Sequence, residues 1–168
     1  MRFAAPAAAL AVVLAMTASV GQSQDHVTDP RAAALVTEGR AAIAAGEPDK
    51  AVDAFEAALT IDPAATGIFL ELAEAARLKG LQGKAIRYYR LALEREPGNL
   101  AALSGEGAAL VEKGALEKAR RNLAKLQSMC GDTCAETRQL AAAIAKGPAP
   151  RVLTAEAVMP DAVVTQQN

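Results

Sequence analysis

The two cysteines of the chain, Cys130 and Cys134, are its clearest candidates for chemistry, and the stretch MCGDTCAET places three residues between them. Thiol oxidoreductases use a two-residue gap at a helix N-terminus, which lowers the pKa of one thiol. Haem attachment requires the same gap with a histidine directly after it, whereas Ala135 stands there. The spacing therefore favours a structural disulfide, with a thiol oxidoreductase as a third and weaker hypothesis for the chain.

Other groups that could support catalysis are few. The single histidine, His26, lies in a polar stretch that follows an apolar N-terminal run, and we expect its side chain to be solvated. A nucleophile needs a base that a rigid scaffold holds within hydrogen-bonding distance. A structural zinc site needs four ligands, which two cysteines and one distant histidine cannot supply. We therefore expect no enzymatic activity, no metal and no cofactor.

The N-terminus has the features of a secretory signal peptide. Arg2 precedes the uncharged run AAPAAALAVVLAMTASVG, and the polar sequence QSQDH follows Gly21. A basic start, an apolar centre and small residues at the exit are typical of a cleaved leader. We expect a signal peptide over residues 1–21, a polar linker over 22–29, and a periplasmic or secreted protein without a membrane span. An uncleaved N-terminal anchor is the alternative.

Export bears on the cysteines, because two nearby thiols in an oxidising compartment more often form a disulfide than a free pair. We therefore predict a Cys130–Cys134 disulfide. The chain has 168 residues, with 3 Phe, 2 Tyr and no Trp, and it is rich in alanine. Alanine has the highest helix propensity, so the composition favours an all-helical domain. The formal net charge of −1 gives no reason to expect binding to nucleic acid.

A repeat of 34 residues organises the middle of the chain. The members that recur at this interval are Ala51, Ala85 and Ala119; Phe55, Tyr89 and Leu123; Gly46, Gly80 and Gly114; and Pro63 and Pro97. Apolar residues within each unit are spaced for one face of a helix, glycine ends the first helix, and proline follows the second. Each unit is therefore predicted to be a helix–turn–helix, and the units must stack to bury their apolar faces.

This pattern resembles the tetratricopeptide repeat (TPR) family. The matching places are Leu35, Gly39, Ala51, Phe55, Ala58 and Pro63 in the first unit; Phe69, Ala73, Ala85, Tyr89, Ala92 and Pro97 in the second; and Leu103, Gly107, Ala119, Leu123 and Leu126 in the third. The resemblance implies an all-α fold, a right-handed α-solenoid of three units at about 32–65, 66–99 and 100–133.

Helix ends can also be placed. Asp29 and Asp62 each precede a proline and are predicted N-caps. Thr133 and Glu136 have the spacing of a capping box, which predicts a capping helix over 134–146. The TPR domain is thus expected over 30–147. The remainder, 148–168, is expected to be a disordered tail, with a recognition segment around VLTAEAV as the alternative.

The resemblance implies a concave groove, lined by the first helix of each unit, in which peptide segments lie. The groove places that correspond in this chain are Val36, Arg40, Ile43, Leu70, Glu71, Glu74, Arg77, Ala108 and Val111. Some family members bind a terminal carboxylate with lysines and asparagines, but only Arg40 is basic at those places here. A helical or extended segment with an apolar stripe is therefore the expected ligand, and a small-molecule substrate is not expected.

Two functions from different classes follow. The leading hypothesis is a non-catalytic, exported bacterial TPR scaffold or adaptor that binds a protein or peptide partner in the periplasm. The alternative is a structural or assembly subunit of a cell-envelope complex, such as secretion, cell-wall or cytochrome-maturation machinery. A stable complex with fixed partners distinguishes the second from the first.

Overall fold

The computed structural model describes residues 26–148 of the chain. The predicted leader, residues 22–25 of the predicted linker and the tail beyond Pro148 lie outside the described residues. Within them the chain forms seven α-helices and no strand, which confirms the all-α fold class. The helices are α1 (Pro30–Ala44), α2 (Pro48–Ile61), α3 (Thr66–Leu78), α4 (Gln82–Arg95), α5 (Leu100–Glu112), α6 (Leu116–Cys130) and α7 (Ala135–Lys146).

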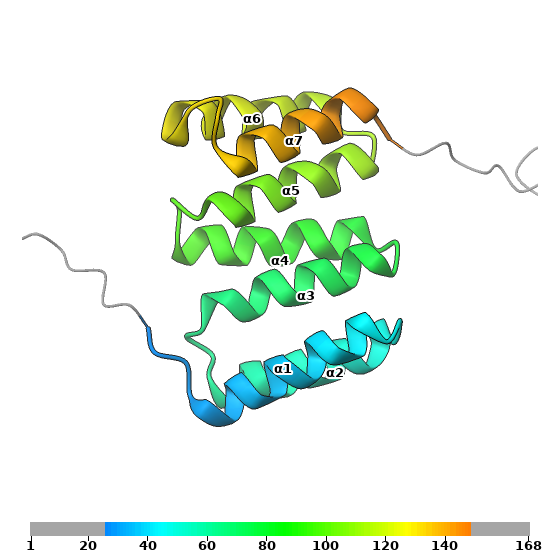
Figure 1. Ribbon diagram of the computed structural model, residues 1–168, viewed down its shortest axis with the longest axis vertical. Helices are drawn as coiled ribbons and strands as arrows, with labels where there is room; N and C mark the ends of the chain where they lie inside the picture. The colour runs from blue at the N-terminus through cyan, green and yellow to red at the C-terminus, as the bar shows by residue number, and fades with distance from the viewer. Residues whose placement is uncertain (1–25, 149–168) are drawn as a thin grey trace, which may run out of the picture.

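The helices stack in chain order along the long axis of the molecule, with α1 and α2 at one end and α6 and α7 at the other (Figure 1). Helix α1 packs against α3, α3 against α5, and α5 against α7. The backbones of α2, α4 and α6 come close to odd-numbered helices but not to one another. We call the surface formed by α1, α3, α5 and α7 the odd-helix face, and the surface formed by α2, α4 and α6 the even-helix face. This is an α-solenoid of helix–turn–helix units, as predicted.

The turns within the units depend on glycine. Gly46, Gly80 and Gly114 have φ values of 76°, 71° and 84°, a left-handed conformation that glycine adopts without steric cost. The prediction that these glycines end the first helix of each unit is therefore confirmed. Asp29 is also confirmed as an N-cap, since its Oδ1 accepts a hydrogen bond from the Arg31 N–H at 2.8 Å.

Two other predicted caps are wrong. Helix α3 begins at Thr66 with Ala65 as N-cap, and the Asp62 carboxylate accepts the N–H of Asp29 instead. Helix α7 begins one residue later than a Thr133 cap requires, and Cys134, in extended conformation, is its N-cap without a side-chain hydrogen bond.

Large side chains fill the spaces that small residues leave. A Cβ atom on Gly39 would lie 2.3 Å from Cε1 of the fully buried Phe55, so only glycine fits there. Leu140 of α7 is fully buried against Gly107 and packs with Leu126. Burial of one such leucine contributes about 1.5–3 kcal/mol. Helix α7 therefore covers the apolar end of the stack.

No helix within residues 26–148 is long and apolar enough to cross a membrane.

Candidate functional site

Cavities open along the odd-helix face of the described residues. One of about 370 Å³ lies between α1 and α3, with Val36, Leu70 and Thr28 in its lining. Two others, of about 400 and 500 Å³, lie between α3, α5 and α7 and share Arg77, Ala108 and Ala143. These two cavities adjoin each other, because they share lining residues. We call the three cavities together the groove.

The structure brings most of the predicted partner-binding residues to this groove. Those that line it are Val36, Arg40, Leu70, Glu71, Glu74, Arg77, Ala108 and Val111. Ile43 does not line it and is half-buried against the core of the first unit. Val111 is only 3 % exposed, so it supports the groove from beneath. That these residues bind a partner stays a prediction.

Arg40 and Glu71 connect α1 to α3 across the first cavity. Arg40 Nε donates to Glu71 Oε1 at 2.9 Å, and a second guanidinium nitrogen also contacts this oxygen. The hydrogen bond and the adjacent negative charge raise the pKa of Arg40 above its ordinary value. Because Arg40 is 65 % exposed, the pair contributes little to stability and mainly orients the two side chains.

Arg77 is the centre of the second part of the groove. Its Nη1 donates to Glu74 Oε2 at 2.8 Å, and its Nε donates to Glu112 Oε1 at 3.2 Å on the neighbouring helix α5. Burial alone would lower the pKa of Arg77, but the hydrogen bond to Glu112 and the charge of Glu74 outweigh it and raise that pKa. The arginine is therefore held charged and fixed.

Tyr89 extends this network from α4. Its hydroxyl donates to Glu74 Oε2 at 3.2 Å, and its ring lies beneath Gly105. Burial, followed by the nearby Glu74 carboxylate, raises the pKa of Tyr89 to about 12. The repeat pattern identifies Tyr89 as a recurring position but does not predict its polar contact, because the contact joins two helices whose side-chain geometry the pattern does not specify.

The charges in the groove are largely balanced within the protein. Arg40 and Arg77 are both engaged by glutamates, so an incoming carboxylate would have to displace Glu71, Glu74 or Glu112. This agrees with the expectation that the groove does not bind a terminal carboxylate. Apolar side chains such as Leu70 remain available between these pairs. The arrangement suits a segment that buries apolar side chains and aligns its polar groups with fixed charges.

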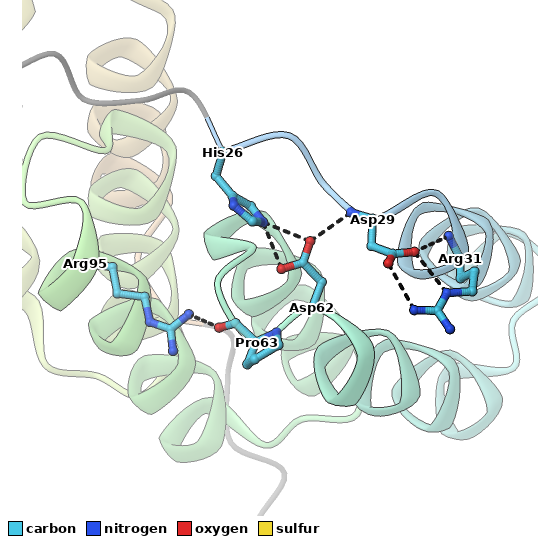
Figure 2. A network of polar contacts seen from close by, with 6 residues as sticks. All are labelled: His26, Asp29, Arg31, Asp62, Pro63 and Arg95. Carbon is cyan, nitrogen blue, oxygen red and sulfur yellow. Dashed lines mark hydrogen bonds and ion pairs between the residues drawn. The ribbon is translucent and has the colours of Figure 1, made fainter.

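The side chain of His26 is exposed, as predicted, with 43 % of its surface accessible, but it also makes a contact that the sequence did not predict. Its Nε2 lies 2.8 Å from both carboxylate oxygens of Asp62, which is only 6 % exposed and also accepts the Asp29 N–H at 2.9 Å (Figure 2). The Asp29 hydrogen bond, and then the one with His26, lower the pKa of Asp62. Arg95 donates to the adjacent Pro63 carbonyl.

This network anchors the segment before α1 to the turn between α2 and α3, next to Thr28 in the first cavity. The contact could not be predicted because His26 and Asp62 are 36 residues apart in the sequence. The recurrence of Asp-Pro at Asp29 and Asp62 was the one available signal that the two turns are neighbours.

Cys130 and Cys134 lie at the junction of the two faces, at the end of α6 and the start of α7. Their sulfur atoms are joined, and their Cα atoms are 5.9 Å apart, which suits a disulfide. The hydroxyl oxygen of the buried Thr137 lies 3.3 Å from Cys134 Sγ. Within residues 26–148, no group of three or more His, Cys, Asp or Glu side chains could hold a metal ion.

Comparison with known proteins identifies the repeat. Residues 32–65 match the family model for the tetratricopeptide repeat. No curated protein matches the sequence significantly. The Sgt2 TPR domain of Aspergillus fumigatus is similar in structure, with a TM-score of 0.64, 26 % identity, and coverage of 83 % of this chain and 95 % of that one.

Some of the similar structures contain a peptide. The first TPR domain of Spaghetti (RPAP3), bound to an HSP90 peptide, has a TM-score of 0.61 at 22 % identity and covers 72 % of this chain and 98 % of its own. The Yersinia enterocolitica type III secretion chaperone SycD, in complex with a peptide of the translocator YopD, has a TM-score of 0.59 at 19 % identity, with coverage of 68 % and 86 %. The chain therefore has the TPR fold.

Proposed function

We propose that this protein is a non-catalytic adaptor that binds a segment of a partner protein in the groove of its odd-helix face. The observation that carries this proposal is the groove itself, in which apolar side chains such as Leu70 alternate with arginines that glutamates hold in place. The peptides bound by the Spaghetti domain and by SycD support it, since both have the same fold.

The expected ligand is a helical or extended segment with an apolar stripe. Val36 and Leu70 line the first cavity, and each apolar side chain that the partner buries contributes about 1.5–3 kcal/mol. The charged pairs Arg40–Glu71 and Arg77–Glu112 would then fix the orientation of the segment. Neither a small-molecule substrate nor nucleic acid is part of the proposal.

The proposal also includes the location and the redox state of the protein. The leader before Gln22 directs export to the bacterial periplasm, and there the Cys130–Cys134 pair is oxidised. Cell fractionation, N-terminal sequencing of the purified protein and thiol titration test these points together. A cytoplasmic protein with an intact N-terminus and two free thiols would contradict them.

Affinity capture with groove variants tests the binding proposal. Leu70→Asp and Arg77→Gln should each abolish recovery of a specific partner from periplasmic extract. Leu81→Asp and Arg138→Gln are the matched controls, because both residues are exposed and lie outside the groove. Equal recovery with groove and control variants would reject the groove as the binding site.

A second measurement separates an adaptor from a structural subunit. Size-exclusion chromatography of native extract should show the adaptor mostly free, because exchange of partners requires a population without ligand. Elution only in one large complex of fixed composition would favour the alternative of a cell-envelope assembly subunit.

A further inference from the structure

The even-helix face changes its charge from one unit to the next. Asp53 on α2, Arg87 on α4 and Arg121 on α6 stand at the interval of 34 residues and therefore occupy equivalent positions. All three side chains are exposed. The face is thus acidic in the first unit, where Glu56 adds a further carboxylate, and basic in the second and third.

A cavity of about 360 Å³ opens in the basic part of this face. It lies between α4, the end of α5 and α6, and its floor includes the apolar residues Ile86 and Leu110. Its rim carries four cationic side chains, Arg87, Arg90, Lys113 and Lys118, and one carboxylate, Glu94. An apolar floor with a basic rim differs from the charge-balanced groove.

The rim has cations that the protein does not neutralise. Within residues 26–148, Arg87 and Lys118 take part in no hydrogen bond or ion pair. Arg90 is oriented by the buried Glu106, whose Oε1 it contacts at 2.7 Å and whose Oε2 accepts from Asn122 at 3.0 Å. Arg87 and Lys118 are therefore free to contact an anionic partner, and Arg90 is held in place beside them.

We propose that this cavity is a second docking site, which binds an acidic polypeptide segment that places an apolar side chain on the Ile86–Leu110 floor. Charge complementarity selects the acidic residues of the segment, and the enclosed floor selects the apolar one. A planar anionic membrane fits less well, because it cannot reach the floor and the acidic residues Asp53 and Glu56 share the same face. The site is distinct from the groove and does not rest on its function.

Fluorescence anisotropy on the full-length mature protein tests the proposal. The probe is a fluorescein-labelled peptide of sequence EEDLLEDE, and the peptide KKRLLRKK is its charge-reversed counterpart. The protein should bind the acidic probe and not the basic one. Binding should weaken when salt is raised to about 0.3 M, because exposed charges are screened.

Charge reversal locates the site. The double variant Arg87→Glu with Lys118→Glu should raise the dissociation constant about tenfold or more. The double variant Lys50→Glu with Arg138→Glu changes the net charge by the same amount, but at positions away from the cavity. It should change the dissociation constant by less than about twofold. Arg77→Gln, in the groove, should leave binding of the probe unchanged. Circular dichroism confirms folding, and Arg87→Gln with Lys118→Gln replaces the reversal variant if that variant does not fold.

Several results would overturn the proposal. Equal loss of peptide binding in both double variants would mean that the peptide responds only to the overall charge of the protein. Loss of peptide binding in Arg77→Gln would mean that the peptide binds in the groove. Stronger binding to phosphatidylcholine–phosphatidylglycerol vesicles than to the peptide would identify a membrane surface. Salt-sensitive self-association in sedimentation, abolished by Arg87→Glu with Lys118→Glu, would identify a second copy of the chain as the occupant.

Discussion

Arg77 and Arg87 show how differently the two faces of this molecule use the same residue type. Arg77, on the odd-helix face, is 23 % exposed and lies between Glu74 and Glu112. Arg87, on the even-helix face, is exposed and contacts no carboxylate among residues 26–148. The first arginine shapes a rigid, charge-balanced groove, and the second offers its charge to a partner.

The comparison shows that a net charge near zero can hide two kinds of electrostatic surface. The chain carries a formal charge of −1, yet its even-helix face is acidic at one end and basic at the other. Charges paired within the protein contribute to shape and depend weakly on salt, whereas exposed unpaired charges contribute to encounter with a partner and depend on it strongly.

The largest expected effect concerns the floor of the groove. A Cβ atom on Gly105 would lie 2.4 Å from the Tyr89 ring, which is 4 % exposed and cannot move away. Gly105→Ala should therefore lower the free energy of unfolding in urea by about 3 kcal/mol. Gly67→Ala is the control, because nothing lies within 4 Å of its Cβ, and it should raise stability by about 0.5 kcal/mol. Similar values for both would contradict the close packing.

The next prediction tests the contrast between the two arginines directly. Arg77→Ala leaves the Glu74 and Glu112 carboxylates without their shared cation and should cost about 2 kcal/mol in urea unfolding. Arg87→Ala removes no contact within the described residues and should change stability by less than about 0.5 kcal/mol. A larger loss for Arg87→Ala than for Arg77→Ala would reverse the comparison.

The Cys130–Cys134 bond joins the last even-numbered helix to the last wall of the groove. Replacement of both cysteines by serine should cost at most about 2 kcal/mol, because so short a loop restricts the unfolded chain little. Helix α7 should stay docked through Leu140 and through the hydrogen bond from Ser104 Oγ to the Glu136 carbonyl at 3.1 Å. Thermal unfolding measures the loss of stability, and partner capture measures whether the groove still binds. Loss of partner binding would show that α7 needs the disulfide to stay docked.

Acid should weaken the anchor at the first end of the groove. The pKa of Asp62 is lowered in the folded protein, so its contribution is present above the ordinary aspartate value of about 3.9 and disappears as the pH falls through the lowered value. The melting temperature should drop over that acidic range. Asp62→Asn should be less stable at neutral pH and should lose that part of the pH dependence; a parallel pH profile would argue against the anchor.

The smallest expected effect is a shift in the alkaline titration of the Tyr89 hydroxyl. The pKa of Tyr89 is raised to about 12 by burial and by Glu74. In a Tyr88→Phe background, where Tyr89 is the only tyrosine left, absorbance at alkaline pH should follow this ionisation. Glu74→Gln should shift the titration to lower pH, because it removes a negative charge beside the hydroxyl. An unchanged titration curve would remove Glu74 from the network.

Much of the fold could be predicted from the sequence, because the same short-range signals for helices and turns recur in three units. Glycine at Gly46, Gly80 and Gly114 and apolar residues at helical spacing predict helices and turns without knowledge of their neighbours. The features that the sequence did not predict correctly are the His26–Asp62 contact, between residues 36 positions apart, and the N-caps of α3 and α7.

The repeat is sufficient to predict the helices, their turns and the order in which they stack. Which charged residues form pairs depends on how the helices pack against one another. Arg40 and Glu71 are 31 residues apart, and Arg77 and Glu112 are 35 apart, and both pairs form because successive odd-numbered helices pack on each other. Asp53 and Arg87 have a comparable separation of 34 residues but stay apart, because the backbones of the even-numbered helices do not come close to one another. A separation of about one repeat therefore gives a salt bridge on one face and a free charge on the other.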